Sequence, residues 1–389
     1  MIDIEKIRAD TPSCQEIIHF NNAGASLMPK PVFAALQRVL EDENRLGGYE
    51  AERRAQPDIH GFYAAFGALL NADPDEIAYV ENATRAWDMV FYGLRLGKGD
   101  RVITHSSEYA SNYLALLQQS RRLGFEIDLV PSDRFGQIDV EQLEAMLTPQ
   151  TKLIAITHVP TQGGLVNPAA AVGELAQKHG IAYLLDACQS VGQIDVDVAQ
   201  IGCDFLSGTG RKFLRGPRGT GFLYVRRSML ERIDPPFVDL LSAKWTAHNS
   251  YEFAAGAKRF ENWESNVAGR VALGEAVRYA KAIGLNHIET RVAKLADVLR
   301  EALSDIKGVQ VRDLGQTKCG IVTFTKEGRD PQFIEERLRE KGINVSVALM
   351  TSARLDLEAR NLSSLVRASV HYFNTEDEIS RFVEAVQSI

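Results

Sequence analysis

A lysine and an aspartate each follow a short apolar run of the kind that forms a buried strand. Lys212 closes the segment Gly208-Thr209-Gly210-Arg211-Lys212, after the run Phe205–Ser207. Asp186 comes directly after the run Ala182–Leu185. Ligands of open α/β sheets gather at the carboxyl ends of strands, so we expect both side chains to face one cleft. There the lysine can form a Schiff base, and the aspartate can keep a pyridine nitrogen protonated.

A phosphate site is predicted where the segment Glu81-Asn82-Ala83-Thr84 opens an apolar helix. Small polar residues at a helix start bind phosphate through free N–H groups and the helix dipole. The turn-rich loop 158–164, which includes Thr161, adds polar groups after the run Leu153–Thr157. A lysine, an aspartate, a phosphate cup and flanking hydrogen-bond donors together match what pyridoxal 5'-phosphate (PLP) needs, so PLP is the predicted cofactor.

Each of these pieces also has a simpler explanation. An aspartate at a strand end is often only a helix cap, and a single lysine is usually a solvated surface charge. Other cofactor motifs fail: the third glycine of a dinucleotide fingerprint would fall at Phe213, and no P-loop sequence occurs. No paired Cys/His spacing predicts a metal site.

Composition narrows the class of protein. The formal net charge of −7 argues against a general nucleic-acid binder. No stretch of about 18 apolar residues predicts a membrane helix, and the polar start MIDIEKIRAD does not resemble a secretory signal. The four cysteines are far apart in sequence, which favours a reduced, cytoplasmic chain.

The order of the expected elements predicts an α/β fold. Seven apolar runs between residues 77 and 225 alternate with helical patterns, and most are continuous, as in a mostly parallel sheet covered on both faces. A long helical region is expected from Val267 to about Leu303, followed by short strands and helices. We therefore predict a large domain over residues 20–265, and a smaller α+β domain formed by 1–19 and 266–389.

Several of these segments, in this order, resemble the class V aminotransferases of PLP fold type I. That group includes cysteine desulfurases, C–S lyases and isopenicillin N epimerase. The resemblance extends from Phe20-Asn21-Asn22-Ala23-Gly24 to Arg367, nearly the whole chain. It implies a homodimer with active sites at the subunit interface and an amino-acid substrate.

The resemblance also implies roles for individual residues. Lys212 matches the catalytic Schiff-base lysine, Asp186 the partner of the pyridine nitrogen, and Arg367 the arginine that binds the substrate carboxylate. A bidentate guanidinium suits that last role. The other predicted cofactor-binding residues are Ala83, Thr84, Tyr109, Thr161, Gln189, Thr209 and Arg211, and Asn22 is predicted near the substrate.

Three departures from the family pattern bear on the reaction. The stretch Ala348–Arg354 lacks the nucleophilic cysteine that desulfurases carry before the carboxylate-binding arginine. Ala110 stands at one candidate position of the histidine that stacks on PLP, which leaves Tyr109 as the nearest aromatic. Trp263 and Glu264 interrupt the segment that reaches the partner's phosphate in the family.

These departures favour a C–S lyase that performs α,β-elimination on a cysteine-derived amino acid without a persulfide. An aminotransferase or an amino-acid epimerase of the same family is the alternative. A third hypothesis, of another class, is a PLP-fold binding protein that has lost catalysis. Lys212, Asp186 and Arg367 are all present and favour an enzyme.

Overall fold

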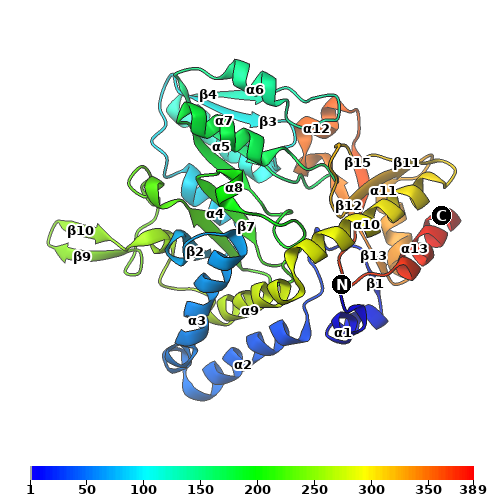
Figure 1. Cartoon of the computed structure of the whole chain (residues 1–389), viewed down its shortest axis with the longest axis horizontal. Helices are drawn as coiled ribbons and strands as arrows, with labels where there is room; N and C mark the ends of the chain where they lie inside the picture. Colours follow the sequence, from blue (N-terminus) through cyan, green and yellow to red (C-terminus); the bar gives the residue numbers. More distant parts are fainter. Residues whose placement is uncertain (1) are drawn as a thin grey trace.

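The computed structural model describes residues 2–389, and its largest element is a seven-stranded sheet (Figure 1). The strand order is β2-β8-β7-β6-β5-β3-β4, in which β8 is antiparallel to both of its neighbours. The strands are β2 (Ile77–Val80), β3 (Arg101–His105), β4 (Glu126–Val130), β5 (Thr151–Thr157), β6 (Ala182–Asp186), β7 (Phe205–Thr209) and β8 (Gly221–Val225). The predicted α/β fold with a mostly parallel seven-stranded sheet is therefore confirmed.

Helices cover both faces of this sheet, which explains why its strands are continuous apolar runs. In β2, Ile77 and Tyr79 join the core under α3, α7 and α9, whereas Ala78 and Val80 join the core under α4 and α5. The helices of this part are α2 (Lys30–Leu46), α3 (Gly48–Leu70), α4 (Ala83–Phe91), α5 (Ala110–Leu123), α6 (Val140–Met146), α7 (Ala169–His179), α8 (Val198–Ile201) and α9 (Val267–Ile283).

A smaller four-stranded sheet, in the order β11-β12-β15-β14, forms the second part of the molecule. Its strands are antiparallel, and α10, α11 and α13 contribute to the core beside it. The elements are β11 (Val309–Val311), β12 (Ile321–Lys326), β14 (Ser346–Leu349), β15 (Ser364–Ser369), α10 (Leu285–Ser304), α11 (Pro331–Glu340), α12 (Arg354–Ala359) and α13 (Glu376–Ser388).

The long helical region after residue 266 is divided in two. Gly284 has a φ of 96°, a left-handed value that favours glycine, and it ends α9 and begins α10. Helix α9 packs against α2 and α3 beside the large sheet, whereas α10 lines the core of the small one. The two-domain division stays a prediction, and Gly284 is the point at which the chain passes from the helix beside the large sheet to the helix beside the small one.

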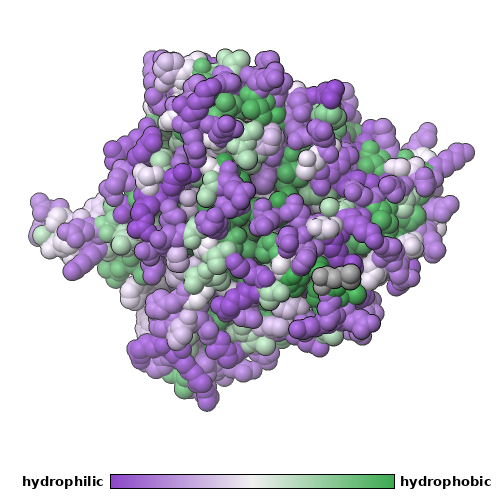
Figure 2. Space-filling view, in the orientation of Figure 1, coloured by the Kyte–Doolittle hydropathy of each residue, from purple (hydrophilic) through white to green (hydrophobic). Residues whose placement is uncertain are grey.

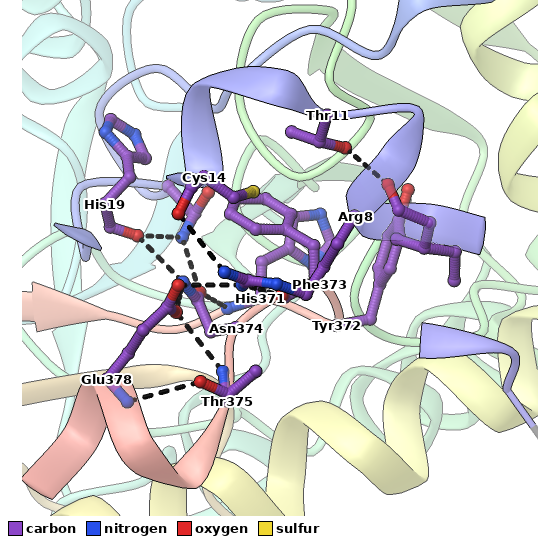
Figure 3. Close-up of polar contacts among 12 residues, drawn as sticks. Arg8, Thr11, Cys14, His19, His371, Tyr372, Phe373, Asn374, Thr375 and Glu378 are labelled. Carbon is purple, nitrogen blue, oxygen red and sulfur yellow. Dashed lines mark hydrogen bonds and ion pairs between the residues drawn. The ribbon is translucent and has the colours of Figure 1, made fainter. Parts of the chain in front are cut away.

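The N-terminal segment is held to the C-terminal part of the chain by polar contacts (Figure 3). It comprises α1 (Ile4–Ala9), a turn at Pro12–Gln15 and the short strand β1 (Ile18–His19), which pairs with β13 (Ile343–Asn344). Arg8 donates from Nη1 to Glu378 Oε1 at 2.7 Å and to the Phe373 carbonyl at 2.9 Å. The start of the chain therefore lies against the segment after β15 and the first turn of α13.

A two-stranded hairpin, β9 (Ala243–Ala247) with β10 (Ser250–Phe253), projects from the body at the left of Figure 1. Trp245 is 73% exposed and Tyr251 55% exposed, and Figure 2 shows mixed polar and apolar residues at this projection. Short 3-10 turns complete the chain at Pro74–Glu76, Arg227–Met229, Gly256–Phe260 and Met350–Ser352. Among residues 2–389 no helix is both long and apolar enough to span a bilayer.

Candidate active site

Lys212 lies in the turn that follows β7, at the carboxyl edge of the large sheet. The turn is held by backbone bonds, from Gly210 N–H to the Thr220 carbonyl at 2.9 Å and from Arg215 N–H to the Lys212 carbonyl at 2.9 Å. Gly210 is required there, since a Cβ would stand 2.4 Å from Thr220 Oγ1. The predicted lysine is thus presented by a fixed turn beside the ends of the parallel strands.

Asp186 is the last residue of β6, the strand next to β7, and it is 4% exposed. Its Oδ1 accepts the Cys188 N–H at 2.9 Å, and its Oδ2 accepts Asn112 Nδ2 at 2.8 Å. No ion pair engages Asp186 among the residues that the structure describes. Two neutral donors therefore orient the carboxylate, and its charge is available to a ligand.

The electrostatics of the lysine favour its neutral amine. Burial lowers the pKa of Lys212, and the positive charges of Arg211 and Arg367 act in the same direction. Cys188 and Asp186 oppose this shift, which places both of them near the amine. A neutral amine can attack a carbonyl or accept a proton, so the cleft prepares Lys212 for either task.

The start of helix α4 lies against the ends of β7 and β8. A Cβ on Gly221 would stand 2.8 Å from the Asn82 carbonyl carbon, so only glycine permits this close approach. Asn82 caps the helix by accepting the Arg85 N–H at 2.9 Å. The first N–H groups of a helix have no intrahelical acceptor, so those of Ala83 and Thr84 can bind an anion.

Thr209 ends β7 close to this helix start. It is 8% exposed, and its hydroxyl donates to the Thr220 carbonyl at 3.2 Å, which leaves its oxygen lone pairs for a further partner. The structure therefore brings Ala83, Thr84 and Thr209 to the same edge of the sheet as Lys212, as the sequence predicts.

Arg367 comes from β15 of the small sheet and reaches the loop after β5. Its Nη1 donates to the Thr161 hydroxyl at 2.7 Å and to the Thr161 carbonyl at 3.0 Å, and its Nε donates to Ser346 Oγ at 3.1 Å. Burial lowers the pKa of Arg367 to about 10, and the nearby charge of Arg211 adds to the effect. Arg367 has no carboxylate partner within residues 2–389, so it can bind an anionic ligand.

Arg211 points toward the N-terminal loop. Its guanidinium donates to the Gly24 carbonyl, and its own carbonyl accepts the Ser26 N–H at 2.8 Å. The expected contact with the cofactor phosphate therefore stays a prediction for Arg211. Its observed contacts assign it to fixing loop 20–26 beside Lys212.

Asn22, predicted near the substrate, is completely buried. Its Nδ2 donates to the Ser369 carbonyl at 2.7 Å, and its Oδ1 accepts the Ser26 hydroxyl at 2.7 Å. These contacts join the N-terminal loop to β15. The structure favours this joining role over the predicted contact of Asn22 with a substrate.

Tyr109 and Gln189 are two further residues predicted to contact the cofactor. Tyr109 is partly exposed, precedes α5, and lies close enough to Arg367 to influence its charge. Gln189 is 2% exposed, and its Nε2 donates to the Ala23 carbonyl at 3.1 Å. The cofactor contacts of both residues stay predictions.

Buried polar atoms without protein partners gather around Asp186. Within residues 2–389, Gln189 Oε1, His158 Nδ1 and Ser207 Oγ have none. Ser207 pairs with Asp186 across β6 and β7, and His158 N–H donates to the Asp186 carbonyl. Buried polar atoms are normally satisfied, so this group fits the binding of a polar cofactor such as PLP.

Glu108 and Asn112 form part of this site, and the sequence reading assigned them no role. Both are buried, and Asn112 Nδ2 donates to Glu108 Oε1 at 2.8 Å as well as to Asp186. The signal in the sequence is a carboxylate just before helix α5 and an amide in its first turn, four residues apart, which is close enough for the two side chains to meet.

Comparison with known proteins identifies relatives across the whole chain. The family model for Aminotransferase class-V matches residues 18–382. A probable cysteine desulfurase of Methanothermobacter thermautotrophicus is 30% identical over 391 residues, which cover 99% of this chain and 98% of that protein. A probable cysteine desulfurase of Xylella fastidiosa is 31% identical and covers 100% of this chain and 95% of its own length.

Solved structures agree with the fold. The apo structure of a cysteine desulfurase from Thermococcus onnurineus superposes with a TM-score of 0.92 at 26% identity, covering 100% of this chain and 98% of that one. A cystine C–S lyase in complex with its reaction product cysteine persulfide superposes with a TM-score of 0.88 at 23% identity, covering 97% and 99%. At that lower identity the likeness shows the fold alone.

Proposed function

This chain belongs to the class V aminotransferase family of PLP-dependent enzymes, and we propose that it is a C–S lyase acting on a cysteine-derived amino acid. The reaction is an α,β-elimination that forms no persulfide on the enzyme. One observation carries the proposal. Desulfurases of this family carry a cysteine in the segment before the carboxylate-binding arginine, but the segment between β14 and β15 of this chain contains no cysteine.

That segment is folded onto the protein body. Ala353 and Leu357 are 1% and 0% exposed and join a small apolar cluster with Ala348 and Leu365. Asp356 of α12 accepts Gln162 Nε2 at 3.1 Å, so the segment is attached to the loop after β5. A fixed segment without a thiol supports a reaction in which no sulfur is transferred to this loop.

The cysteines elsewhere in the chain are poorly suited to accept sulfur. Cys14, Cys203 and Cys319 are buried, and only Cys188 lies near Lys212. Burial raises the pKa of the Cys188 thiol to about 12, and burial raises that of Cys319 to about 11. The thiolate is the nucleophile, so neither cysteine is activated near neutral pH.

The roles proposed for the residues of the site are consistent with elimination. Lys212 would hold the cofactor, Asp186 would pair with its pyridine nitrogen, and the start of α4 with Thr209 would hold its phosphate. When bound, PLP supplies an electron sink for the negative charge that develops at the substrate Cα.

Arg367, positioned by Thr161, binds the substrate carboxylate and so fixes which bond to Cα faces the lysine. Burial lowers the pKa of Lys212, which would suit its Nζ, once released from the cofactor, to take the Cα proton as general base. The electron pair of the Cα–H bond would form a Cα–Cβ double bond as the Cβ–S bond breaks, and sulfur would leave with the electrons of that bond as a thiolate. The three-carbon fragment left behind would react with water to give pyruvate and ammonia.

Product analysis tests the proposal. Purified enzyme is incubated with L-cystine, S-methyl-L-cysteine and L-cysteine, and pyruvate, thiol, alanine, keto acid and D-amino acid are measured separately. A lyase gives pyruvate and thiol or persulfide in equal amounts. Alanine with enzyme-bound persulfide would establish a desulfurase instead, whereas keto acid without thiol would establish a transaminase, and D-amino acid an epimerase.

The non-catalytic alternative is tested by colour. The enzyme is expected to be yellow and to lose its visible absorbance in the Lys212→Ala variant. A colourless protein that takes up no added PLP would refute the cofactor assignment for this chain. A yellow protein that yields none of the products above would favour a binding role.

A homodimer is part of the same proposal. The hairpin β9–β10 and its flanks expose Leu240, Trp245, Tyr251 and Trp263, and such clustered apolar exposure is typical of an interface. We expect light scattering to give twice the chain mass. The double substitution Trp245→Ser with Tyr251→Ser should shift it toward monomer, whereas Phe333→Ser on α11 should leave it unchanged.

The proposed compartment is the cytoplasm. All four cysteines are free thiols, which fits a reducing environment. Fractionation of cells that produce the tagged full-length chain tests this, and recovery of the protein outside the cytoplasmic fraction would contradict it.

A further inference from the structure

Glu108 is a buried carboxylate that no cation neutralises. It is 3% exposed, and in the described part of the chain no lysine, arginine or histidine pairs with it. Its Oε1 accepts Asn112 Nδ2 at 2.8 Å and the Tyr109 N–H at 2.9 Å, as well as the Thr157 hydroxyl. Its Oε2 accepts the Thr104 hydroxyl at 3.1 Å. Four neutral donors hold this side chain in one position.

Asn112 connects this carboxylate to the one at the cofactor cleft. Its single Nδ2 donates to Glu108 Oε1 and to Asp186 Oδ2, both at 2.8 Å. An amide nitrogen carries two hydrogens, so these two bonds use both of them. The orientation of Asp186 therefore depends on an amide that is itself oriented by Glu108.

We propose that Glu108 is a positioning residue which acts through Asn112 on Asp186 and strengthens the binding of PLP when Glu108 is ionised. This goes beyond the roles given above, in which Asp186 alone faces the pyridine nitrogen. An ionised Glu108 adds a second negative charge on the same side of the cleft. That charge favours the protonated, positively charged form of a pyridine ring.

The charge of Glu108 changes in an accessible pH range. Burial raises its pKa to about 7, and the neighbouring charge of Asp186 adds to the increase. The donors from Thr157, Asn112 and the Tyr109 backbone oppose it. Among residues 2–389, Asp186 is the one charged group that faces Glu108, because the groups that contact Glu108 from β3, β5 and α5 are neutral. Cys188 and Lys212 lie beyond Asp186.

The experiment measures the dissociation constant of PLP from the full-length apoprotein at pH 6, 7 and 8.5 by fluorescence titration. The variant is Glu108→Gln, whose Oε1 can keep the three donors and whose Nε2 can donate to Thr104. Wild-type Glu108 is protonated at pH 6, so the variant should then bind PLP equally well. At pH 8.5 the variant should bind about tenfold more weakly, because it lacks the charge.

Two further variants separate the charge from the hydrogen bond. Asn112→Leu removes the donor to Asp186 and should weaken PLP binding by a similar factor at every pH. Ser120→Ala, which loses one side-chain hydrogen bond at the far end of α5, should bind as wild type does. The informative quantity is the dissociation constant of PLP for Glu108→Gln divided by that for wild type. If this ratio is the same at all three pH values, including a ratio of one, the proposal is overturned.

Thr157→Val provides an independent test if Glu108→Gln does not fold. The lost hydroxyl donor stabilises the ionised form of Glu108, so its removal should raise the pKa of that carboxyl. The pH midpoint at which PLP binding strengthens should then move up by about half a unit. An unmoved midpoint would show that Glu108 is not the titrating group.

Discussion

Arg367 Nη1 and Thr161 Oγ1 lie 2.7 Å apart although 206 positions separate the two residues in the chain. Arg367 belongs to β15 of the small sheet, and Thr161 to the loop that follows β5 of the large one. The proposed carboxylate site therefore exists only where the two sheets meet. Its geometry depends on how the two parts of the molecule are held together.

Arg367→Lys should weaken the binding of the substrate and leave the cofactor in place. Lysine cannot reproduce the planar fork that contacts Thr161 and a carboxylate together. We expect KM for the pyruvate-forming substrate to rise about 100-fold, with unchanged visible absorbance. The control is Arg337→Lys on the surface of α11, which should leave KM unchanged. An unchanged KM in Arg367→Lys would remove Arg367 from the substrate site.

Lys212→Met should stabilise the apoprotein at neutral pH. The pKa of Lys212 is lowered in the folded state from its ordinary 10.5, so protonating this amine costs folding free energy below that pH. The penalty is full below the folded pKa and disappears as the pH rises to about 10.5. We expect a gain of about 1 kcal/mol or more at pH 7 and none at pH 10.5, measured by urea unfolding.

The matched control for that measurement is Lys178→Met on α7. Lys178 is exposed and pairs with Glu144 at 2.6 Å, so its removal should not stabilise the protein. A loss of stability in Lys212→Met at pH 7 would mean that the amine is favourably paired in the folded apoprotein.

Cys188→Ser should leave elimination intact. Cys188 is the cysteine near Lys212, and its raised pKa makes it a poor sulfur acceptor at neutral pH. We expect pyruvate formation within about twofold of wild type and no enzyme-bound persulfide by mass spectrometry in either protein. If Cys188→Ser no longer releases sulfur and wild-type Cys188 carries a persulfide, the results favour the desulfurase alternative.

Glu261→Gln should destabilise the protein strongly. Glu261 is 2% exposed, pairs with Arg270 Nη2 at 2.9 Å and accepts the Tyr63 hydroxyl at 2.8 Å. Removing one partner of a buried ion pair leaves an uncompensated charge, here on Arg270, and costs about 3 kcal/mol.

Equilibrium unfolding in urea measures this loss, and Glu275→Gln is its control. Glu275 pairs with Arg278 on the more exposed face of α9, so the loss there should be about 0.5 kcal/mol or less. Equal losses at the two positions would contradict the buried-pair argument.

The large sheet could be predicted because each of its strands is marked by a pattern of adjacent residues in the sequence. Continuous apolar runs such as Leu153–Thr157 require burial on both faces, and Lys212 and Asp186 stand directly after such runs. The helix boundary at Gly284 could have been anticipated from the glycine, but an isolated glycine inside a helical pattern is usually tolerated.

The features that the sequence did not predict depend on contacts between residues that are far apart in the chain. The hairpin β9–β10 has no buried face, since both its strands are largely exposed, so no burial pattern marks it. The importance of Glu108 follows from its bonds to Thr157 and Asn112 and its distance from any cation, which only the folded chain shows. Likewise the burial of Asn22 results from its contact with Ser369, near the opposite end of the chain.

Arg215, three residues after Lys212, has a left-handed φ of 60° and is 1% exposed. Its guanidinium donates to the Thr11 hydroxyl at 2.6 Å and to the Tyr372 hydroxyl at 2.9 Å, and Figure 3 shows those two side chains within the buried polar cluster. The turn that carries the lysine is thus anchored at once to the beginning and to the end of the chain. During synthesis on the ribosome, this turn cannot reach its final form until Tyr372 has emerged, so a nascent or C-terminally truncated chain should not retain the cofactor.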